Sequence, residues 1–288
     1  MKDNLMLIIK GFIMGIANII PGVSGGTLAI ILGIYEKFIG AISNIFSNFK
    51  ENLKFLLLVF IGMGLSLVTM SNVITYSYEN FPIPTTMFFM GLVIGGIPLL
   101  YKKVKGKKEK KEISSWIIFF ATFSIVIIIA LSDKIFAGTL GTVDFSNMSL
   151  GNYILLFLVG AIAAATMIIP GVSGSLVLML LGYYYPIINL IKELTQFNNL
   201  FSNLLVAGVF GVGILVGIVL ISKLIEFLFK RFEIKTYYGV LGFIFASIIA
   251  IPIATFSEVQ ITFDLLHMVV GVLTGVLGGI IAYKLGER

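Results

Sequence analysis

Two long stretches of this chain carry no charged residue, and they limit its possible folds more than any other feature. Residues 11–35 and 150–191 contain no Asp, Glu, Lys or Arg. A soluble domain carries about 25% charged residues because its surface faces water, whereas this chain has 12% charged and 58% hydrophobic residues over 288 positions. Since about 20 apolar residues span the hydrocarbon core of a bilayer, the sequence predicts an all-α polytopic membrane protein.

The same composition excludes several other classes of protein. A soluble enzyme, a nucleic-acid-binding protein and a secreted disulfide scaffold all need a more polar or cysteine-rich chain. The chain has no cysteine and a single histidine, His267, so we predict no metal site of Cys or clustered His ligands and no cofactor. The net charge of +6 reflects a local cluster, because seven lysines lie within residues 102–111.

An internal repeat divides the chain into two similar halves. The sequence Ile-Ile-Pro-Gly-Val-Ser-Gly occupies residues 19–25 and occurs again at residues 168–174, an offset of 149 residues. The same offset pairs the Leu-Gly of residues 32–33 with that of residues 181–182, and Tyr35 with Tyr184. We therefore predict a duplication with a first repeat at 1–132, an external connector at 133–149 and a second repeat at 150–288.

Each predicted half contains two short and three long apolar segments, all too long for barrel strands and without strict alternation, which indicates helices. The short segments flank the Pro-Gly-Val-Ser-Gly break and lie near residues 5–20, 26–42, 152–169 and 175–191. The long segments lie near residues 55–76, 85–101, 113–131, 204–221, 236–253 and 265–283.

The distribution of lysine and arginine predicts the orientation of these helices. Short loops rich in these residues stay on the cytoplasmic side, which places residues 102–111 and 223–235 inside. Residues 78–84 and 255–261 contain no basic residue and are predicted to lie outside. Tracing the chain from these loops places both termini in the cytoplasm and inverts the second half relative to the first. Many secondary transporters are built from inverted repeats of this kind.

The two short segment pairs are predicted to be re-entrant hairpins whose tips meet near the middle of the membrane. Proline and consecutive glycines interrupt a helix, and non-helical backbone at membrane depth must be buried in protein or line a wet cavity. The alternative is a protein with ten complete crossings, in which the Pro-Gly breaks are turns at the membrane surface. Loop charge alone does not separate the two arrangements.

The residues after the two breaks are suited to bind an anion. The first turn of a helix has unpaired N–H groups and a partial positive charge, glycine admits a ligand to the backbone, and hydroxyls add donors. The predicted substrate-binding residues of the two tips are Ser24, Gly25, Gly26, Thr27, Ser173, Gly174 and Ser175. The same residues also suit helix capping and close packing, but their occurrence in both halves favours a substrate site.

A few further polar residues lie near the hairpins. Asn18 precedes the first break and is added to the predicted site, whereas its counterpart in the second half is Met167. Lys10 and Lys37 are candidates for attracting a phosphate, with ordinary anchoring at the cytoplasmic side as the alternative. Glu36 is a candidate carrier of a coupling proton, with a simple ion pair as the alternative.

The sequence around both breaks resembles a known family. Lys-Gly at residues 10–11, Ala-Asn-Ile-Ile-Pro-Gly-Val-Ser-Gly-Gly-Thr at 17–27 and Leu-Gly-Ile-Tyr-Glu at 32–36 resemble the first signature of the bacterial and archaeal polyprenyl-phosphate transporters. Residues 169–175 and 181–184 resemble the second signature. The resemblance implies a flippase and not an enzyme. Its substrate would be undecaprenyl (polyprenyl) phosphate, whose headgroup returns from the outer to the inner leaflet of the cytoplasmic membrane.

Two other functions fit parts of the sequence. Undecaprenyl-diphosphate phosphatases resemble this plan, but an arginine follows their signature serine, where this chain has Gly25 and Gly174, and phosphoryl transfer needs cationic charge at its transition state. An anion channel or exchanger is the other alternative, because helix N-termini also coordinate small anions. A lipid substrate needs an apolar lateral path beside the site, which an ion pore does not.

Overall fold

The regular structure of the chain is helical throughout the part that the structure describes. The computed structural model describes residues 2–19, 23–105, 113–136, 143, 145, 148–197, 199–258 and 264–286. The helices, in chain order, are α1 (Lys2–Ile19), α2 (Gly25–Ile31), α3 (Tyr35–Ser43), α4 (Phe49–Asn80), α5 (Pro82–Lys105), α6 (Ile113–Phe136), α7 (Leu150–Ile168), α8 (Gly174–Leu180), α9 (Tyr184–Thr195), α10 (Leu200–Arg231), α11 (Glu233–Glu258) and α12 (Leu265–Gly286). The predicted all-α class is therefore confirmed.

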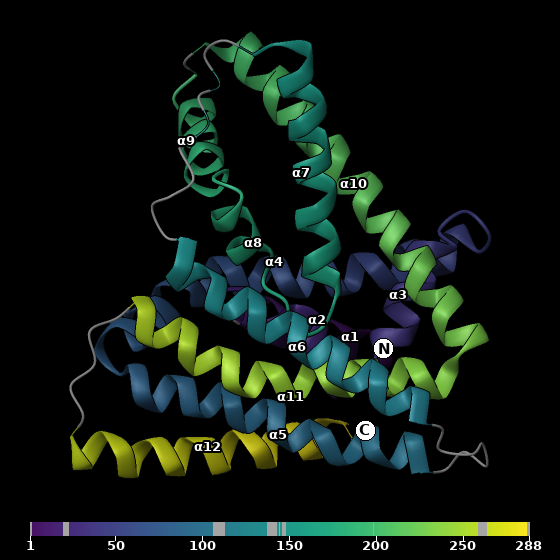
Figure 1. The fold of residues 1–288 in the computed structure, drawn as a ribbon, viewed down its shortest axis with the longest axis vertical. Coiled ribbons are helices and arrows are strands. Elements are labelled where there is room, and N and C mark those ends of the chain that lie inside the picture. Colours follow the sequence, from purple (N-terminus) through teal and green to yellow (C-terminus); the bar gives the residue numbers. More distant parts are fainter. Residues whose placement is uncertain are drawn as a thin grey trace.

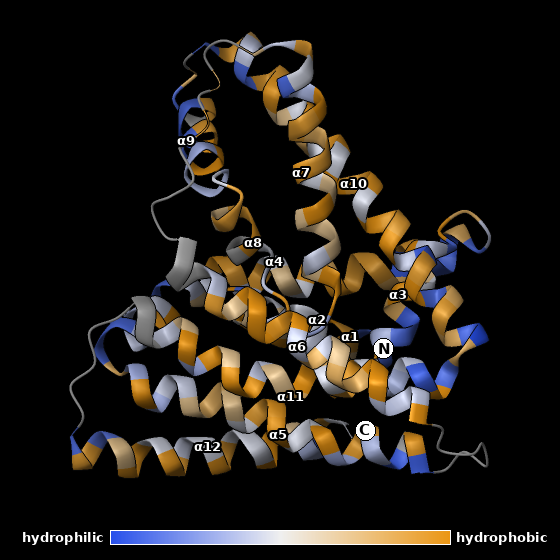
Figure 2. Cartoon of the chain, in the orientation of Figure 1, coloured by the Kyte–Doolittle hydropathy of each residue, from blue (hydrophilic) through white to orange (hydrophobic). Residues whose placement is uncertain are grey.

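Seven of the described helices are long and apolar enough to cross a membrane: α4, α5, α6, α7, α10, α11 and α12. Hydrophobic residues run along these helices and hydrophilic residues gather at their ends (Figure 2). Many large apolar side chains face outward, for example Val68 and Leu273, which are 82% and 64% exposed. Such surfaces are stable only against lipid, so the chain is a polytopic membrane protein.

The second arms of the hairpins differ from the prediction of one helix each. Residues 26–42 form two short helices, α2 and α3, whose axes are bent by 118°, and residues 175–191 are likewise divided between α8 and α9. A helix of seven residues such as α2 is about 10 Å long, one third of the roughly 30 Å hydrocarbon core. An arm this short favours the re-entrant arrangement over ten complete crossings.

The bends occur at the repeated Leu-Gly pair. Gly33 and Gly182 have φ angles of +70° and +77°, a backbone conformation that glycine adopts without a Cβ penalty. At the end of α2, the N–H of Gly33 donates to Ile30 O (2.9 Å) and the N–H of Ile34 donates to Ala29 O (3.0 Å). This pair of bonds is the Schellman motif, and α8 ends with the same pair at Gly182 and Tyr183.

Glycines bring the long helices into close contact. A Cβ at Gly91 or Gly95 of α5 would overlap the carbonyl oxygen of Gly275 or Gly279 of α12. Gly11 of α1 is held as closely against α4. Because lipid gives no hydrophobic drive for helix association, contact through small residues is the main way to gain packing energy inside a membrane.

The helix pairs occur in two equivalent sets, as a duplication requires. The first helix of each half packs along the fourth, which gives the pairs α1–α4 and α7–α10. The fifth helix of each half packs along the sixth helix of the other half, which gives α5–α12 and α6–α11. The four helices α5, α6, α11 and α12 form a layer from which α7, α9 and part of α10 project (Figure 1). The boundaries of the repeats at 132 and 150 remain a prediction.

The inverted orientation also remains a prediction, and Phe81 and Phe232 provide a matched test of it. Each ends a long helix and starts the next, with nearly the same backbone angles (φ −131° and −136°), and each is close to 45% exposed. The α4–α5 turn lies at the left of Figure 1 and the α10–α11 turn at the right. In vesicles, we expect an impermeant thiol reagent to label a Phe81→Cys variant from outside and a Phe232→Cys variant from inside. Labelling of both from one side would contradict the inversion.

Candidate functional site

The two hairpin tips line one cavity of about 380 Å³ near the centre of the molecule. Six of the predicted substrate-binding residues line it: Asn18, Ser24, Gly25, Gly26, Ser173 and Gly174. Its other walls come from α1, α3, α4 and α6 to α11. Segments that lie 149 residues apart in the sequence therefore form a single site.

The tips are in direct contact, as the repeated motif predicts. The hydroxyl of Ser24 donates to Ile169 O (3.3 Å), and the backbone N–H of Gly171 donates to Thr27 Oγ1 (2.8 Å). At Gly26 a Cβ would lie 2.6 Å from Ile168 O, so only glycine permits this approach. In both bonds a side chain of the first tip supplies the partner for polar backbone of the second tip, which non-helical backbone needs inside a membrane.

Asn18 makes the first tip different from the second. Its Oδ1 accepts a hydrogen bond from the N–H of Gly25 (3.1 Å), so this N–H, which the sequence analysis assigned to the substrate, has a partner within the protein. Asn18 lines the cavity, and its amide group offers N–H donors there. In the second tip the apolar side chain of Met167 lies against Gly174 instead.

Two predicted site residues are not part of the cavity lining that the structure describes. Thr27 is 1% exposed, and its hydroxyl oxygen accepts the Gly171 hydrogen bond, so it holds the tips together. The side chain of Ser175 lies outside the described part of the structure, although its backbone belongs to α8.

The charged candidates Lys10, Glu36 and Lys37 lie away from this cavity. Lys10 Nζ donates to Leu32 O (2.7 Å), where it caps the carbonyl end of α2. Glu36 Oε1 accepts a hydrogen bond from the hydroxyl of Tyr237 (2.5 Å), and the ammonium of Lys37 lies 5.0 Å from the centre of the Phe55 ring. These contacts hold the first hairpin in place, and the roles in phosphate attraction and proton coupling remain predictions.

Sequence reasoning missed Tyr35 and Tyr184, which both line the cavity. Tyr35 is buried, and its hydroxyl donates to Ile168 O (3.3 Å), which joins the first hairpin to the second tip. The sequence analysis had paired the two tyrosines through the repeat offset, but it did not assign them to the site. Their equivalent positions after the Leu-Gly bends were the signal that could have found them.

The cavity combines neutral hydrogen-bond donors with apolar walls. Its described lining contains no Asp, Glu, Lys, Arg or His, and the apolar side chains include Met14, Met63, Met167 and Met179. Hydroxyl and amide donors bind a phosphate oxygen through hydrogen bonds. The arrangement is suited to holding and releasing an anionic group attached to an apolar molecule.

A polytopic membrane protein with two broken hairpins that meet at one uncharged cavity has the architecture of a transporter. The sequence matches the model of the VCA0040-like family, described as undecaprenyl phosphate translocase-like, over residues 14–265. The chain belongs to this family.

Two curated relatives extend over most of the chain. The chain is 33% identical over 245 residues to a polyprenyl-phosphate transporter of Staphylococcus aureus, and the match covers 85% of this chain and 84% of the relative. The chain is 28% identical over 240 residues to a polyprenyl-phosphate transporter of Vibrio cholerae, and the match covers 78% of this chain and 70% of the relative. No solved structure matches the chain significantly.

Proposed function

We propose that this protein moves polyprenyl phosphate from the outer to the inner leaflet of the cytoplasmic membrane, with both termini on the cytoplasmic side. The names of the relatives from two bacteria support the substrate. The positive-inside distribution of lysine and arginine supports the orientation. The phosphate headgroup lies in the cavity between the tips, and the polyprenyl chain stays in apolar surroundings.

The observation that carries this proposal is that hydroxyls from both halves, Ser24 and Ser173, line one cavity whose described lining is uncharged. A cation in a site of low dielectric would strengthen phosphate binding, and a transporter must also release its cargo. Neutral donors give weaker bonds. A phosphatase would need charge at the tip, where this chain has Gly25 and Gly174.

Removal of either tip hydroxyl tests this site. We expect Ser24→Ala and Ser173→Ala each to slow leaflet exchange of labelled undecaprenyl phosphate in proteoliposomes about three- to tenfold, because a neutral hydrogen bond contributes about 0.5–1.5 kcal/mol. In this proposal the Ser24 hydroxyl exchanges its bond to Ile169 O for one to the headgroup. Ser77→Ala serves as the control, since the Ser77 hydroxyl donates within α4 to Val73 O (2.8 Å) and does not line the cavity. Wild-type exchange in both tip variants would contradict the assignment.

The same vesicles distinguish a lipid transporter from a small-anion channel. We expect exchange of the labelled lipid without a matching flux of chloride or inorganic phosphate. Rapid flux of either ion, with no lipid exchange, would favour the channel.

A further inference from the structure

A second cavity, of about 470 Å³, lies beside the headgroup cavity between α6, α10 and α11. We call it the chain groove. Its lining is almost entirely apolar and includes Ile118, Ile221, Leu224, Leu228, Val240 and Phe243. A volume of this size is typical of sites for small organic ligands, which are also mostly apolar.

The two cavities share a thin wall made by the second tip. Ile168 and Gly171 line the headgroup cavity, whereas Ile169 and Pro170, between them in sequence, line the chain groove. The side chain of Tyr35 lines both cavities and donates its hydrogen bond to Ile168 O. A lipid whose phosphate lies in the headgroup cavity therefore has an apolar groove next to it, at Tyr35.

The chain groove opens sideways toward lipid, and one of its ends carries a cation. Leu224 and Phe232 are 51% and 44% exposed on the outer surface of α10 and at its end. Lys235 and Thr236 line the groove beside the α10–α11 turn, at the end that the loop charges place in the cytoplasm. An apolar groove with a cation at the level of the lipid headgroups complements a lipid that has one anionic phosphate and a long hydrocarbon chain.

We propose that the chain groove binds the isoprene units next to the phosphate of polyprenyl phosphate while the headgroup occupies the cavity between the tips. This inference rests on the proposed function and deepens it, because it names a site for the hydrocarbon part of the substrate. Because the phosphate and the first isoprene unit are covalently bonded, the side chain of Tyr35, which lines both cavities, must turn aside to let one molecule occupy both. Lys235 interacts with the phosphate where the lipid enters or leaves the inner leaflet.

Occupancy of the groove is tested by photo-cross-linking at two leucines of α10. Leu224 lines the groove, whereas Leu220, one turn earlier, does not, and the two are 51% and 61% exposed. We expect a Leu224→p-benzoylphenylalanine variant to cross-link radiolabelled undecaprenyl phosphate, with competition by unlabelled undecaprenyl phosphate but not by phosphatidylglycerol. The Leu220→p-benzoylphenylalanine variant should show no such specific competition. Equal cross-linking at both positions, or equal competition by phosphatidylglycerol, would mean that bilayer lipid fills the groove and would overturn the proposal.

Filling the groove tests its role in transport. We expect Leu224→Trp to slow exchange of undecaprenyl phosphate about tenfold, which corresponds to about 1.4 kcal/mol, and Leu220→Trp to leave it unchanged. Equal rates in the two variants would also contradict the proposal. If the Leu224→p-benzoylphenylalanine variant cross-links the lipid at the groove but the wild-type protein exchanges none between leaflets, the proposed function fails while the binding site stands. If the tip serine variants slow exchange but Leu224→Trp does not, the groove fails while the function stands.

Discussion

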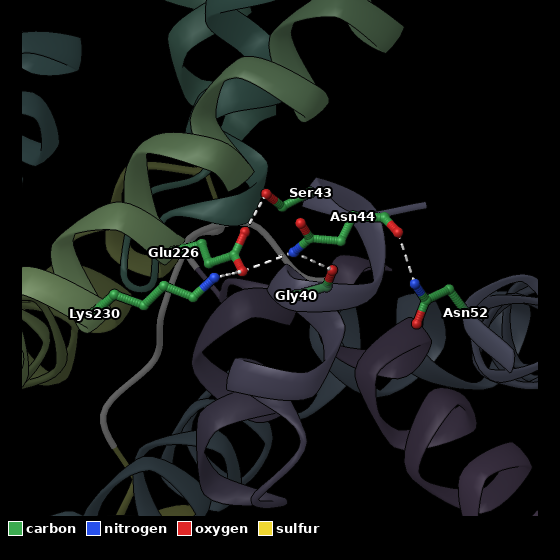
Figure 3. Close-up of polar contacts among 6 residues, drawn as sticks. All are labelled: Gly40, Ser43, Asn44, Asn52, Glu226 and Lys230. Atoms are coloured by element: carbon green, nitrogen blue, oxygen red, sulfur yellow. Dashed lines mark hydrogen bonds and ion pairs between the residues drawn. The ribbon is translucent and has the colours of Figure 1, made fainter. Parts of the chain in front are cut away.

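A cross-link between α3 and α10 is expected to stop lipid exchange completely. The two helices belong to different halves and are joined by a polar cluster around Glu226 of α10 (Figure 3). The hydroxyl of Ser43 donates to Glu226 Oε2, and Asn44 Nδ2 donates to Oε1 (2.7 Å). Lys230 Nζ lies 2.6 Å from the same Oε1. Asn52 Nδ2 of α4 donates to Asn44 O (2.8 Å), so the cluster also includes the start of the next helix.

This cluster lies beyond residues that line the headgroup cavity. Ile42 of α3 and Ile218 of α10 line the cavity; Ser43 follows Ile42 directly, and Glu226 lies about two turns after Ile218. The equivalent pair in the repeat, α9 and α4, shows no comparable packing in the described part of the chain. Since a transporter must open its site to each leaflet in turn, we expect the α3–α10 contact to separate during transport.

The experiment uses the absence of cysteine from this chain. A Ser43→Cys, Glu226→Cys double variant is treated with a short bifunctional thiol reagent that a reductant cleaves, and lipid exchange is measured before and after reduction. The control is a Glu226→Cys, Lys230→Cys variant, whose cross-link stays within α10 and leaves α3 free. Exchange should be lost only in the first variant and return on reduction. An unchanged rate after complete cross-linking would show that the α3–α10 contact does not open.

Large side chains in place of Gly25 or Gly174 are expected to slow transport at least about 100-fold, or about 2.8 kcal/mol. A Cβ at Gly25 would lie 2.6 Å from Asn18 Oδ1, and one at Gly174 would lie 2.5 Å from Met167 Cγ and 3.0 Å from Ala163 O. The side chains of Asn18 and Met167 line the cavity, so they can turn aside while the new side chain fills the site. The Ala163 carbonyl must shift by a few tenths of an ångström at Gly174. Gly25→Leu and Gly174→Leu should therefore remain folded but exclude the headgroup.

Gly64→Leu and Gly211→Leu are the matched controls, because a Cβ at either glycine meets nothing within 4 Å. Leaflet exchange and thermal stability are measured for all four variants in the same lipid. Wild-type exchange in both tip variants would leave the tip glycines with a packing role only. Loss of stability in the tip variants, without loss of exchange per folded molecule, would have the same meaning.

The sequence by itself determined the membrane class, the long helices and the two tip motifs with their shared sequence. These properties depend on composition, on apolar length and on local breaks, each of which is a property of neighbouring residues. The Leu-Gly bends at Gly33 and Gly182 were also encoded locally, as Schellman ends, but were read as continuous helix because the apolar pattern runs through them.

Only the tertiary structure decided which polar groups remain for a ligand. The N–H of Gly25 has the chemistry to bind an anion but already donates to Asn18, and Thr27 is buried between the tips, where its hydroxyl oxygen accepts from Gly171. Tyr35 lines the headgroup cavity, whereas Lys10 and Glu36 form hydrogen bonds with Leu32 O and Tyr237 away from it. The chain groove likewise exists only because α6, α10 and α11 meet beside the second tip. A buried polar group is bound by whatever partner lies within hydrogen-bond distance, and in this fold the partners come from segments more than 100 residues apart as well as from near neighbours.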